Sequence, residues 1–380
     1  MNTEDILIKS IINHDMDSIL NLFEDKGAHN FYNTTINNDS LILYSIKHKL
    51  PQLLNILIRF KFNMNNIGKG RTTALHVAVI NNNYEITKIL LENDCELSLF
   101  NDNHLTPLHI AIKNKNIQIS ELLINYGADV GNQGYNYVTP LHLACKEGIE
   151  DIVLKLILHG APINSLDEEL STPFHIACKF GHLNIINILY QYGANIHKKN
   201  INGQTGLHLA SIYGHSSLIH DLIDVMNLSV HENDNHMNTP LHLAVRHKQR
   251  RTILELMKKM ANLDQNNDYG SSLHECVDDI VVLNFLIRLL ADVNRKNKNG
   301  QTALHLASKL PNNNGYDSVL LLLLSNAEIN IQDVHGNTAL HYSIIYKNEK
   351  ITNLLIEKGA DESISNSNNE TPFSLLNNLY

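Results

Sequence analysis

The chain has 380 residues, of which 43% are hydrophobic and 18% charged, with a formal net charge of −9 at pH 7 and four cysteines. These values exclude a disulfide-built domain and a disordered chain, and the acidic balance argues against nonspecific nucleic-acid binding as the main activity. The longest apolar run, 319–324, is far shorter than the roughly 20 residues that span a bilayer. Because the N-terminal segment also lacks the features of a secretory signal peptide, we expect a cytoplasmic protein without membrane insertion.

Two segments with helical apolar spacing come first along the chain. The segment 6–29, ILIKSIINHDMDSILNLFEDKGAH, keeps an apolar pattern that ends in Gly-Ala, and 40–60, SLILYSIKHKLPQLLNILIRF, follows it. Both lie at the spacing of a unit that becomes clear only further on, and both have lost most of its motif. We assign residues 1–36 to a degenerate N-terminal capping repeat and 37–68 to a degenerate repeat.

A short motif of the form TPLHLA then recurs to the end of the chain. Its ten copies begin at Thr73, Thr106, Thr139, Thr172, Thr205, Thr239, Ser271, Thr302, Thr338 and Thr371. Successive copies are 33, 33, 33, 33, 34, 32, 31, 36 and 33 residues apart. A nearly constant interval of this length is typical of a stacked repeat array.

Each part of the motif has a physical reason. Thr or Ser accepts a backbone N–H at a helix N-terminus, and Pro suits the first helical position. The Leu is expected in the core, and the Ala allows neighbouring helices to approach closely. A second helix follows in each unit and ends at a Gly that can adopt the left-handed conformation, as in GAN at Gly193. A stretch rich in Asn, Asp and Gly then predicts a hairpin-like turn before the next motif.

These residues resemble the ankyrin repeat, and the resemblance extends from about Ile6 to Tyr380. It implies an all-α fold, an ankyrin-repeat solenoid of helix–turn–helix units with short β-hairpin loops. In such a right-handed array, the loop tips and first helices line a concave side. The remaining repeats are expected at 69–99, 102–131, 135–164, 168–197, 201–230, 235–264, 267–294, 298–332 and 334–363, with a partial C-terminal capping repeat at 367–380.

The regular pattern is interrupted between residues 260 and 320. Met260 and Leu290 replace the Gly that ends the second helix in other units, and Val277-Asp278-Asp279 shortens a turn between helices. The sequence PNNNG at Pro311 inserts residues into the same turn of the next unit. We therefore expect a local kink or a weak seam in this segment.

Histidine and cysteine could suggest a metal or catalytic site. Nine histidines occupy the motif: His76, His109, His142, His175, His208, His242, His274, His305 and His341. The resemblance gives them structural hydrogen bonds. Adjacent ones should also lie about 10 Å apart, too far to share a zinc ion whose ligands are about 2 Å away. Cys145, Cys178 and Cys276 are expected to be small buried side chains. Because no nucleotide-binding or hydrolase motif is present, we predict no enzyme, metal or cofactor.

The resemblance also places a candidate partner-binding surface. Family members read their partners with loop residues just before the Thr and with the exposed end of the first helix. Carried over unit by unit, these positions are Tyr135, Val138, Lys146, Phe180, Ile212, Tyr213, His236, Arg246 and His247. Exposed aromatic side chains beside arginine are typical of interface hot spots. The expected partner is another protein rather than a small-molecule substrate, and the chain itself is expected to be monomeric.

The predicted function is that of a scaffold or adaptor, and three hypotheses about its partner remain open. The first is an effector that binds a host protein, because divergent repeats and abundant Asn, Ile and Lys, whose codons are AT-rich, resemble ankyrin proteins of intracellular bacteria or large DNA viruses. The second is a recognition subunit that docks a catalytic partner. The third is binding of an acidic surface or nucleic acid by a basic cluster between residues 246 and 298, although acidic residues are interleaved with it.

Overall fold

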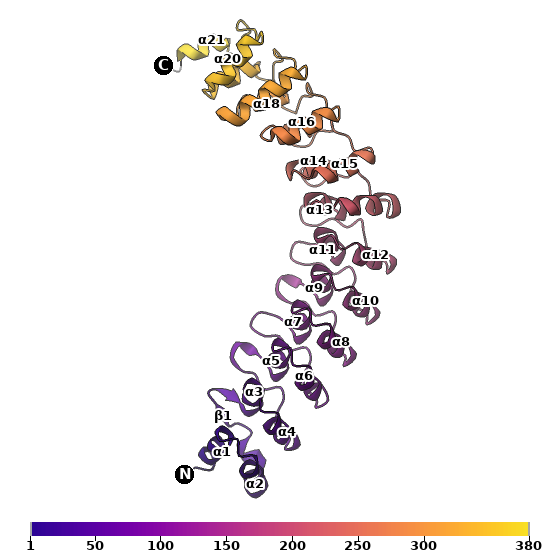
Figure 1. The fold of residues 1–380 in the computed structure, drawn as a ribbon, viewed down its shortest axis with the longest axis vertical. Coiled ribbons are helices and arrows are strands. Elements are labelled where there is room, and N and C mark those ends of the chain that lie inside the picture. Colours follow the sequence, from indigo (N-terminus) through magenta and orange to yellow (C-terminus); the bar gives the residue numbers. More distant parts are fainter. Residues whose placement is uncertain (1, 379–380) are drawn as a thin grey trace. The chain divides into compact units, whose positions relative to one another are not determined.

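The computed structural model describes residues 2–378, and the chain folds as two compact units. The N-terminal unit comprises Met1–Ala177 and His182–Asn195, and the C-terminal unit comprises Cys178–Gly181 and Ile196–Tyr380. Short helices joined by loops make up almost all of both units, which confirms the all-α repeat fold (Figure 1). Within residues 2–378, no helix combines the length and the apolar character needed to cross a membrane.

The N-terminal unit is a succession of helix pairs. Its helices are α1 (Thr3–Ile12), α2 (Met16–Lys26), η1 (Ala28–Phe31), α3 (Leu41–Lys47), α4 (Pro51–Arg59), η2 (Lys69–Arg71), α5 (Ala74–Ile80), α6 (Tyr84–Leu91), α7 (Pro107–Lys113), α8 (Ile117–Asn125), η3 (Tyr135–Tyr137), α9 (Pro140–Glu147), α10 (Glu150–Leu158) and α12 (Leu183–Gln191). The helix α11 (Pro173–Phe180) contributes residues to both units. First helices α3, α5, α7 and α9 pack in one row, and second helices α6, α8, α10 and α12 pack in another (Figure 1).

The motif residues build the core of each pair, as their chemistry predicts. The motif leucines are at most 1% exposed: Leu75, Leu108, Leu141, Leu207, Leu241, Leu304 and Leu340. The alanine three residues later is fully buried wherever it occurs in a complete motif, as at Ala78 and Ala144. Burying each leucine contributes about 1.5–3 kcal/mol, and the alanine lets adjacent first helices come close enough to do so.

The loops between repeats are held to one another by single backbone hydrogen bonds. A β-ladder occurs in the loop before α3, where β1 (Thr35–Ile36) pairs antiparallel with β2 (Asp39–Ser40) across a turn. In other loops the backbone N–H of one tip donates to a carbonyl of the preceding tip. The Asp102 N–H donates to the Gly70 carbonyl at 2.9 Å in the N-terminal unit. The Asn235 N–H donates to the Asn202 carbonyl at 3.0 Å in the C-terminal unit. These bonds therefore join several pairs of neighbouring loops within each unit.

The C-terminal unit follows the same plan with more variation. Its helices are α13 (Gly206–Ile212), η4 (Ser216–Leu218), η5 (Asp221–Val225), α14 (Pro240–Arg246), α15 (Arg250–Lys258), η6 (His274–Cys276), α16 (Ile280–Arg288), α17 (Ala303–Ala307), α18 (Asn312–Leu324), α19 (Ala339–Ile345), α20 (Glu349–Glu357) and α21 (Pro372–Asn378).

The variation follows the spacing of the motif. The interval of 34 residues after Thr205 contains a π-helical turn, η5, which accommodates one extra residue in a helix. In the unit of Ser271, the first helix is reduced to the three-residue 3₁₀ turn η6. The sequence suggested that the PNNNG insertion enlarges the turn between the two helices, but the structure shows no such enlargement. The insertion lengthens the second helix instead, because α18 begins at Asn312 and has 13 residues, compared with nine in α16.

Loss of the helix-ending Gly leaves the backbone unchanged. Met260 and Leu290 adopt the same left-handed conformation as Gly193, with φ of 63°, 67° and 84°. Their side chains project into solvent, with 81% and 88% of their surface exposed. The substitution therefore adds strain of about 1–2 kcal/mol per residue while the positive φ of this position is kept.

The segment 260–320 should open before the rest of its unit. Besides the strained Met260 and Leu290, it buries side-chain oxygens of Asn266, Ser272 and Ser318 that have no hydrogen-bond partner among the described residues. Each unpaired group costs about 1–3 kcal/mol, and a weak repeat opens locally because a repeat array is stabilised by nearest neighbours. Hydrogen exchange measured by mass spectrometry should be faster here than in α14 or α19, and slower exchange would contradict the prediction.

Candidate functional site

The motif histidines join each repeat to the next. In the first complete motif, the Thr73 hydroxyl lies 2.8 Å from His76 Nδ1, which also accepts the Thr73 backbone N–H at 3.2 Å. The opposite ring nitrogen, Nε2, lies 3.1 Å from the carbonyl oxygen of Leu105 in the following loop. Because Nδ1 accepts a hydrogen bond, Nε2 must carry the proton of the neutral ring and donate a hydrogen bond to that carbonyl. The ring is therefore a neutral bridge between two repeats.

This bridge recurs along both units. In the N-terminal unit, His109 Nε2 lies 3.1 Å from the carbonyl of Val138, and His142 Nε2 lies 3.1 Å from that of Ser171. In the C-terminal unit, His208 Nε2 lies 3.2 Å from the carbonyl of Asn238, and His305 Nε2 lies 3.1 Å from that of Asn337. No group of three His, Cys, Asp or Glu side chains in the described part of the chain is arranged to hold a metal ion.

Burial determines the protonation of these histidines. Desolvation lowers the pKa of His109, His208 and His305 to about 4, although the backbone carbonyls they contact act in the opposite direction. Desolvation likewise raises the pKa of the Cys95 thiol to about 12, and it raises the pKa of Cys145. The thiolate required of a nucleophile is disfavoured at both cysteines.

Three predicted partner-binding residues line one groove in the N-terminal unit. The groove, of about 560 Å³, lies between the loops 102–105 and 135–138 and the ends of α7 and α9, and we call it the N-terminal groove. Its lining includes Asp102, Leu105, Lys113, Tyr135, Val138 and Lys146. Tyr135 is 66% exposed, Lys146 is exposed and Val138 is half-buried. The structure thus brings Tyr135, Val138 and Lys146 together on a surface that a partner could reach.

Three more predicted residues lie at the ends of first helices in the C-terminal unit. Phe180 and Tyr213 are exposed, whereas Ile212 is half-buried. The Lys179 ammonium group lies 5.4 Å from the centre of the Tyr213 ring, close enough for a cation–π interaction. An exposed aromatic ring next to a cation is a common arrangement in protein interfaces.

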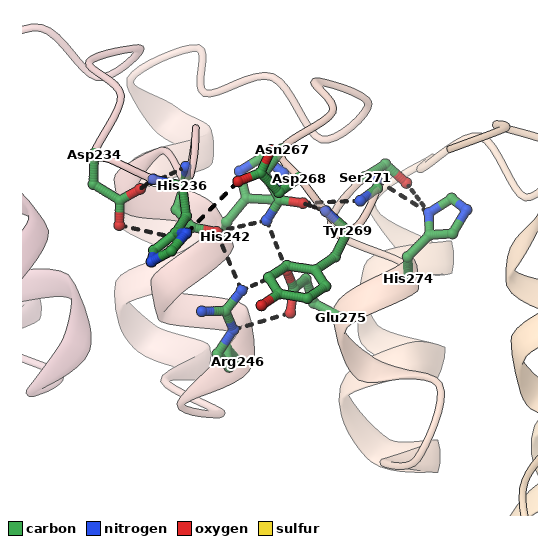
Figure 2. A network of polar contacts seen from close by, with 12 residues as sticks. Asp234, His236, His242, Arg246, Asn267, Asp268, Tyr269, Ser271, His274 and Glu275 are labelled. Atoms are coloured by element: carbon green, nitrogen blue, oxygen red, sulfur yellow. Dashed lines mark hydrogen bonds and ion pairs between the residues drawn. The ribbon is translucent and has the colours of Figure 1, made fainter. Parts of the chain in front are cut away.

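Arg246 has a structural role that the sequence did not reveal (Figure 2). Its Nε and Nη2 donate to the two carboxylate oxygens of Glu275 at 3.0 and 2.7 Å, in a bidentate pair. The Asn267 amide also donates to Glu275 at 2.7 Å, and the Tyr269 ring centre lies 5.4 Å from the guanidinium carbon. The Glu275 side chain is only 8% exposed. Burial opposes its ionisation, but the hydrogen bonds from Arg246 and Asn267 outweigh that effect and lower its pKa.

His236 and His247 lie at the exposed edges of this network. The His236 carbonyl accepts the backbone N–H of Asp268 at 3.2 Å, and the two side chains are 3.6 Å apart (Figure 2). His247 caps the end of α14, and desolvation together with the nearby Arg246 lowers its pKa. Of these residues, His236 and His247 remain accessible, whereas most of the Arg246 hydrogen-bonding capacity is used within the repeat pair.

The structure divides the basic cluster that suggested binding to an acidic surface or nucleic acid. Arg246 and Lys248 end a first helix, Lys258 and Lys259 end a second helix, and Lys298 lies in a loop. Each of these five has a carboxylate partner: Glu275, Asp279, Glu255, Asp224 and Asp268, respectively. These five cations are paired locally on three different surfaces, whereas Arg250, Arg251, Arg295 and Lys296 of the same cluster are exposed.

Sequence reasoning missed several residues of these surfaces. Lys113 lies seven residues after Thr106, just as Lys146 lies seven after Thr139, so this offset could have identified it. Tyr269 and Tyr137 share the position two residues before the motif, and each is 60% exposed. Glu275 offered no such signal because it is paired with a residue 29 positions away.

The architecture and the histidine bridges define an ankyrin-repeat protein. The family model "Ankyrin repeats (3 copies)" matches residues 41–134, 131–200, 174–267 and 273–369. These matches cover most of the sequence, and the chain belongs to the ankyrin-repeat family. Ankyrin repeats are protein–protein interaction modules, and this establishes the general class of the chain.

Similar proteins come from animals and viruses. Protein glp-1 of Caenorhabditis elegans is 30% identical over 152 residues, covering 36% of this chain and 12% of glp-1. An ankyrin repeat protein of Acanthamoeba polyphaga mimivirus, L371, is 30% identical over 143 residues, covering 37% of this chain and 18% of L371. A fowlpox virus ankyrin repeat protein, FPV232, is 42% identical over 81 residues, covering 21% of this chain and 16% of that protein. The chain thus spans less than a fifth of each of these relatives.

The buried histidines predict a loss of stability in mild acid. Since His109, His208 and His305 have pKa values near 4 in the fold and about 6.5 when unfolded, the unfolded chain binds more protons between these values. The free energy of unfolding should therefore be fully present above about pH 6.5 and should fall as the pH decreases toward 4. Urea unfolding at several pH values measures it. The variant His208→Leu should be less stable at pH 7 with a shallower pH dependence, and an unchanged slope would contradict this assignment.

Removing Arg246 should destabilise the C-terminal unit. Arg246→Ala leaves the carboxylate of Glu275 buried without its bidentate donor, at a cost of about 2–3 kcal/mol. The double variant Arg246→Met/Glu275→Leu removes both charges and should recover most of the loss. Urea unfolding of the single and double variants tests this. If Arg246→Ala is as stable as the unmodified chain, the pair does not support the fold.

Proposed function

We propose that this chain is an adaptor that binds another protein through its loop surface, defined as the loop tips and exposed ends of first helices in each unit. The observation that carries the proposal is the exposure of aromatic side chains at these positions. Tyr135 is 66% exposed in the N-terminal unit, and Phe180 and Tyr213 are 39% and 47% exposed in the C-terminal unit. Large rings offer much contact area with few rotatable bonds, which favours them as anchors.

The rigidity of the loops supports binding through this surface. A histidine ties a loop to the preceding first helix, as at His109–Val138, and several loops are also tied to the preceding loop by a backbone hydrogen bond, as at Glu168–Asn136. Preorganised side chains lose little entropy on binding, so more of the contact energy appears as affinity. The same surface could serve a recognition subunit that docks an enzyme, and a catalytic activity of the purified partner would favour that alternative.

A host protein is the partner that we propose, with the chain acting as a monomer in the cytoplasm. The similarity to ankyrin repeat proteins of mimivirus and fowlpox virus supports an interaction with a host protein. A protein is favoured over nucleic acid because the chain has a formal net charge of −9 and five of the cations in the basic cluster have carboxylate partners.

The proposal predicts that loop-surface and second-helix variants differ. With a partner first isolated from the native cell and then purified, Tyr135→Ala in one variant and Phe180→Ala/Tyr213→Ala in another should each weaken binding. Loss of one hot spot of about 2 kcal/mol corresponds to roughly 30-fold in affinity, measurable by calorimetry. The melting temperature should change little because these side chains lie outside the core.

Matched controls remove exposed apolar groups from the other side of the repeats. Tyr126→Ala follows α8 in the N-terminal unit, and Val225→Ala/Leu254→Ala lies on second helices of the C-terminal unit. These variants should retain the affinity of the unmodified chain. If they abolish binding while the loop-surface variants do not, the partner uses the second helices and the proposed site is wrong.

A further inference from the structure

We propose that two adjacent loop tips of the N-terminal unit, 135–137 and 168–170, bind a partner segment in which lysine or arginine stands beside a bulky apolar residue. This inference rests on the proposed function and adds the chemistry of the partner to it. The two segments read Tyr-Asn-Tyr and Glu-Glu-Leu, and all six side chains are exposed. We call them the N-terminal tips.

A backbone hydrogen bond joins the N-terminal tips to each other. The Glu168 N–H donates to the Asn136 carbonyl at 2.9 Å, so the two turns lie side by side. Counted back from the motif threonine, Tyr135 is equivalent to Glu168. In the same way, Tyr137 is equivalent to Leu170. A repeat array places equivalent positions in rows. A ring and a carboxylate therefore share one row of this surface, and a ring and an aliphatic side chain share the next.

The second of these rows is built on strained backbone. Tyr137 and Leu170 have φ of 57° and 55°, in the left-handed region that bulky residues avoid. Three loops of the C-terminal unit have glycine at this position, namely Gly203, Gly300 and Gly336, with φ of 74°, 72° and 73°. In all five loops this residue donates its N–H to the carbonyl three positions earlier, at 2.9–3.2 Å. Glycine would therefore make the same turn without strain, and stability does not explain the two large side chains.

The strained position displays apolar surface to the solvent. Tyr137 is 60% exposed and Leu170 is 44% exposed, and Tyr135 in the neighbouring row is 66% exposed. An apolar side chain of a partner laid against them would remove this area from water, which is favourable in proportion to the area buried. The tyrosine rings also attract cations, because an ammonium or guanidinium group over the face of a ring interacts with its quadrupole.

The charge of the tips indicates which partner they suit. Glu168 and Glu169 are exposed, and neither carboxylate has an ion-pair partner within residues 2–378. The preceding Asp167 is instead engaged within its own turn, where it accepts the N–H groups of Glu169 and Ser171 at 2.9 and 2.8 Å. The lysines that line the N-terminal groove belong to the ends of α7 and α9 rather than to these tips. A cationic side chain that reaches the tips would therefore meet two carboxylates beside two tyrosine rings.

The corresponding tips of the C-terminal unit lack this combination. Met237 holds the same left-handed position, with φ of 60°, and is 49% exposed. The carboxylate in the next tip is that of Asp268, which already lies 3.9 Å from the Lys298 ammonium group and 3.6 Å from the His236 ring. A partner cation would have to compete with these groups. The preference for basic segments should therefore belong to the N-terminal tips.

Selection from a random 12-residue peptide library, carried out in parallel on the full chain and on Tyr137→Gly/Leu170→Gly, tests the proposal. The two proteins have the same net charge, so peptides held only by general attraction to an acidic protein appear with both. Peptides enriched on the unmodified chain should carry Lys or Arg beside an aromatic or aliphatic residue, and the Gly variant should bind them at least tenfold more weakly. Its melting temperature should not fall, because glycine adopts the same φ without strain. If it does fall, Tyr137→Asn/Leu170→Asn replaces it, because asparagine also tolerates this conformation.

A pair of charge variants tests the role of the carboxylates. Glu168→Lys/Glu169→Lys should weaken the selected peptides at least tenfold, and added salt should weaken them as well. The control Glu85→Lys/Glu96→Lys makes the same change in net charge at exposed positions in α6 and after it, and should leave their affinity unchanged. Melting temperatures establish that each variant is folded, and Glu168→Gln/Glu169→Gln replaces the reversal if it is not.

Four results would overturn the inference. They are the absence of any peptide that distinguishes the chain from the Gly variant, distinguishing peptides that are acidic or uncharged, and basic peptides that bind the charge variant as tightly as the control. The fourth is a concentration-dependent dimer that is lost in the Gly variant, which would assign the tips to a second copy of the chain. If one of these is found while Tyr135→Ala still weakens the purified native partner, the proposed function stands and only the partner chemistry is wrong.

Discussion

The bridge made by the motif histidines is the interaction on which this fold depends. One ring nitrogen accepts from the threonine that begins its own helix, and the other donates to a carbonyl of the following loop. The bridge connects elements about 29 residues apart in sequence, so it links neighbouring repeats rather than stabilising one of them. It also requires a neutral imidazole, because a proton on Nδ1 would face the threonine N–H. Burial supplies that condition by lowering the histidine pKa.

Changes in repeat length are absorbed in ways that preserve these bridges. The extra residue after Thr205 is taken up by the π-helical turn η5, and the insertion after Pro311 extends α18. In the unit of Ser271, where residues are missing, the first helix is reduced to η6. The Ser271 hydroxyl nevertheless lies 2.9 Å from His274 Nδ1, as in the other motifs. In the preceding unit the bridge itself adjusts, because His242 reaches the carbonyl of Gln265, 23 residues away. Helices, turns and, in one unit, the carbonyl that the histidine contacts all vary, whereas a contact from the motif histidine to the next loop is kept at both His242 and His274.

The sequence therefore predicted the repeated parts of the fold well and the irregular parts only by location. A motif such as TPLH specifies an N-cap, a core leucine and a bridging histidine by local chemistry, and all three are found at Thr139, Leu141 and His142. An interval of 34 or 36 residues indicates an insertion but does not tell whether a turn, a π-helical turn or a longer helix will accommodate it. That choice depends on packing against the neighbouring repeats. For the same reason, the left-handed conformation of Met260 could not be predicted from a residue type that usually avoids it.

The candidate surface shows why an equivalent position is not an equivalent function. Seven residues after the motif threonine, Lys113 lines a groove, Arg246 is held by Glu275, and Lys309 lies 4.0 Å from the centre of the Tyr342 ring. The repeat aligns the three backbones, but the next repeat decides whether each cation faces a groove, a carboxylate or an aromatic ring. An array built on one bridge can thus vary its surface chemistry from repeat to repeat without changing its fold.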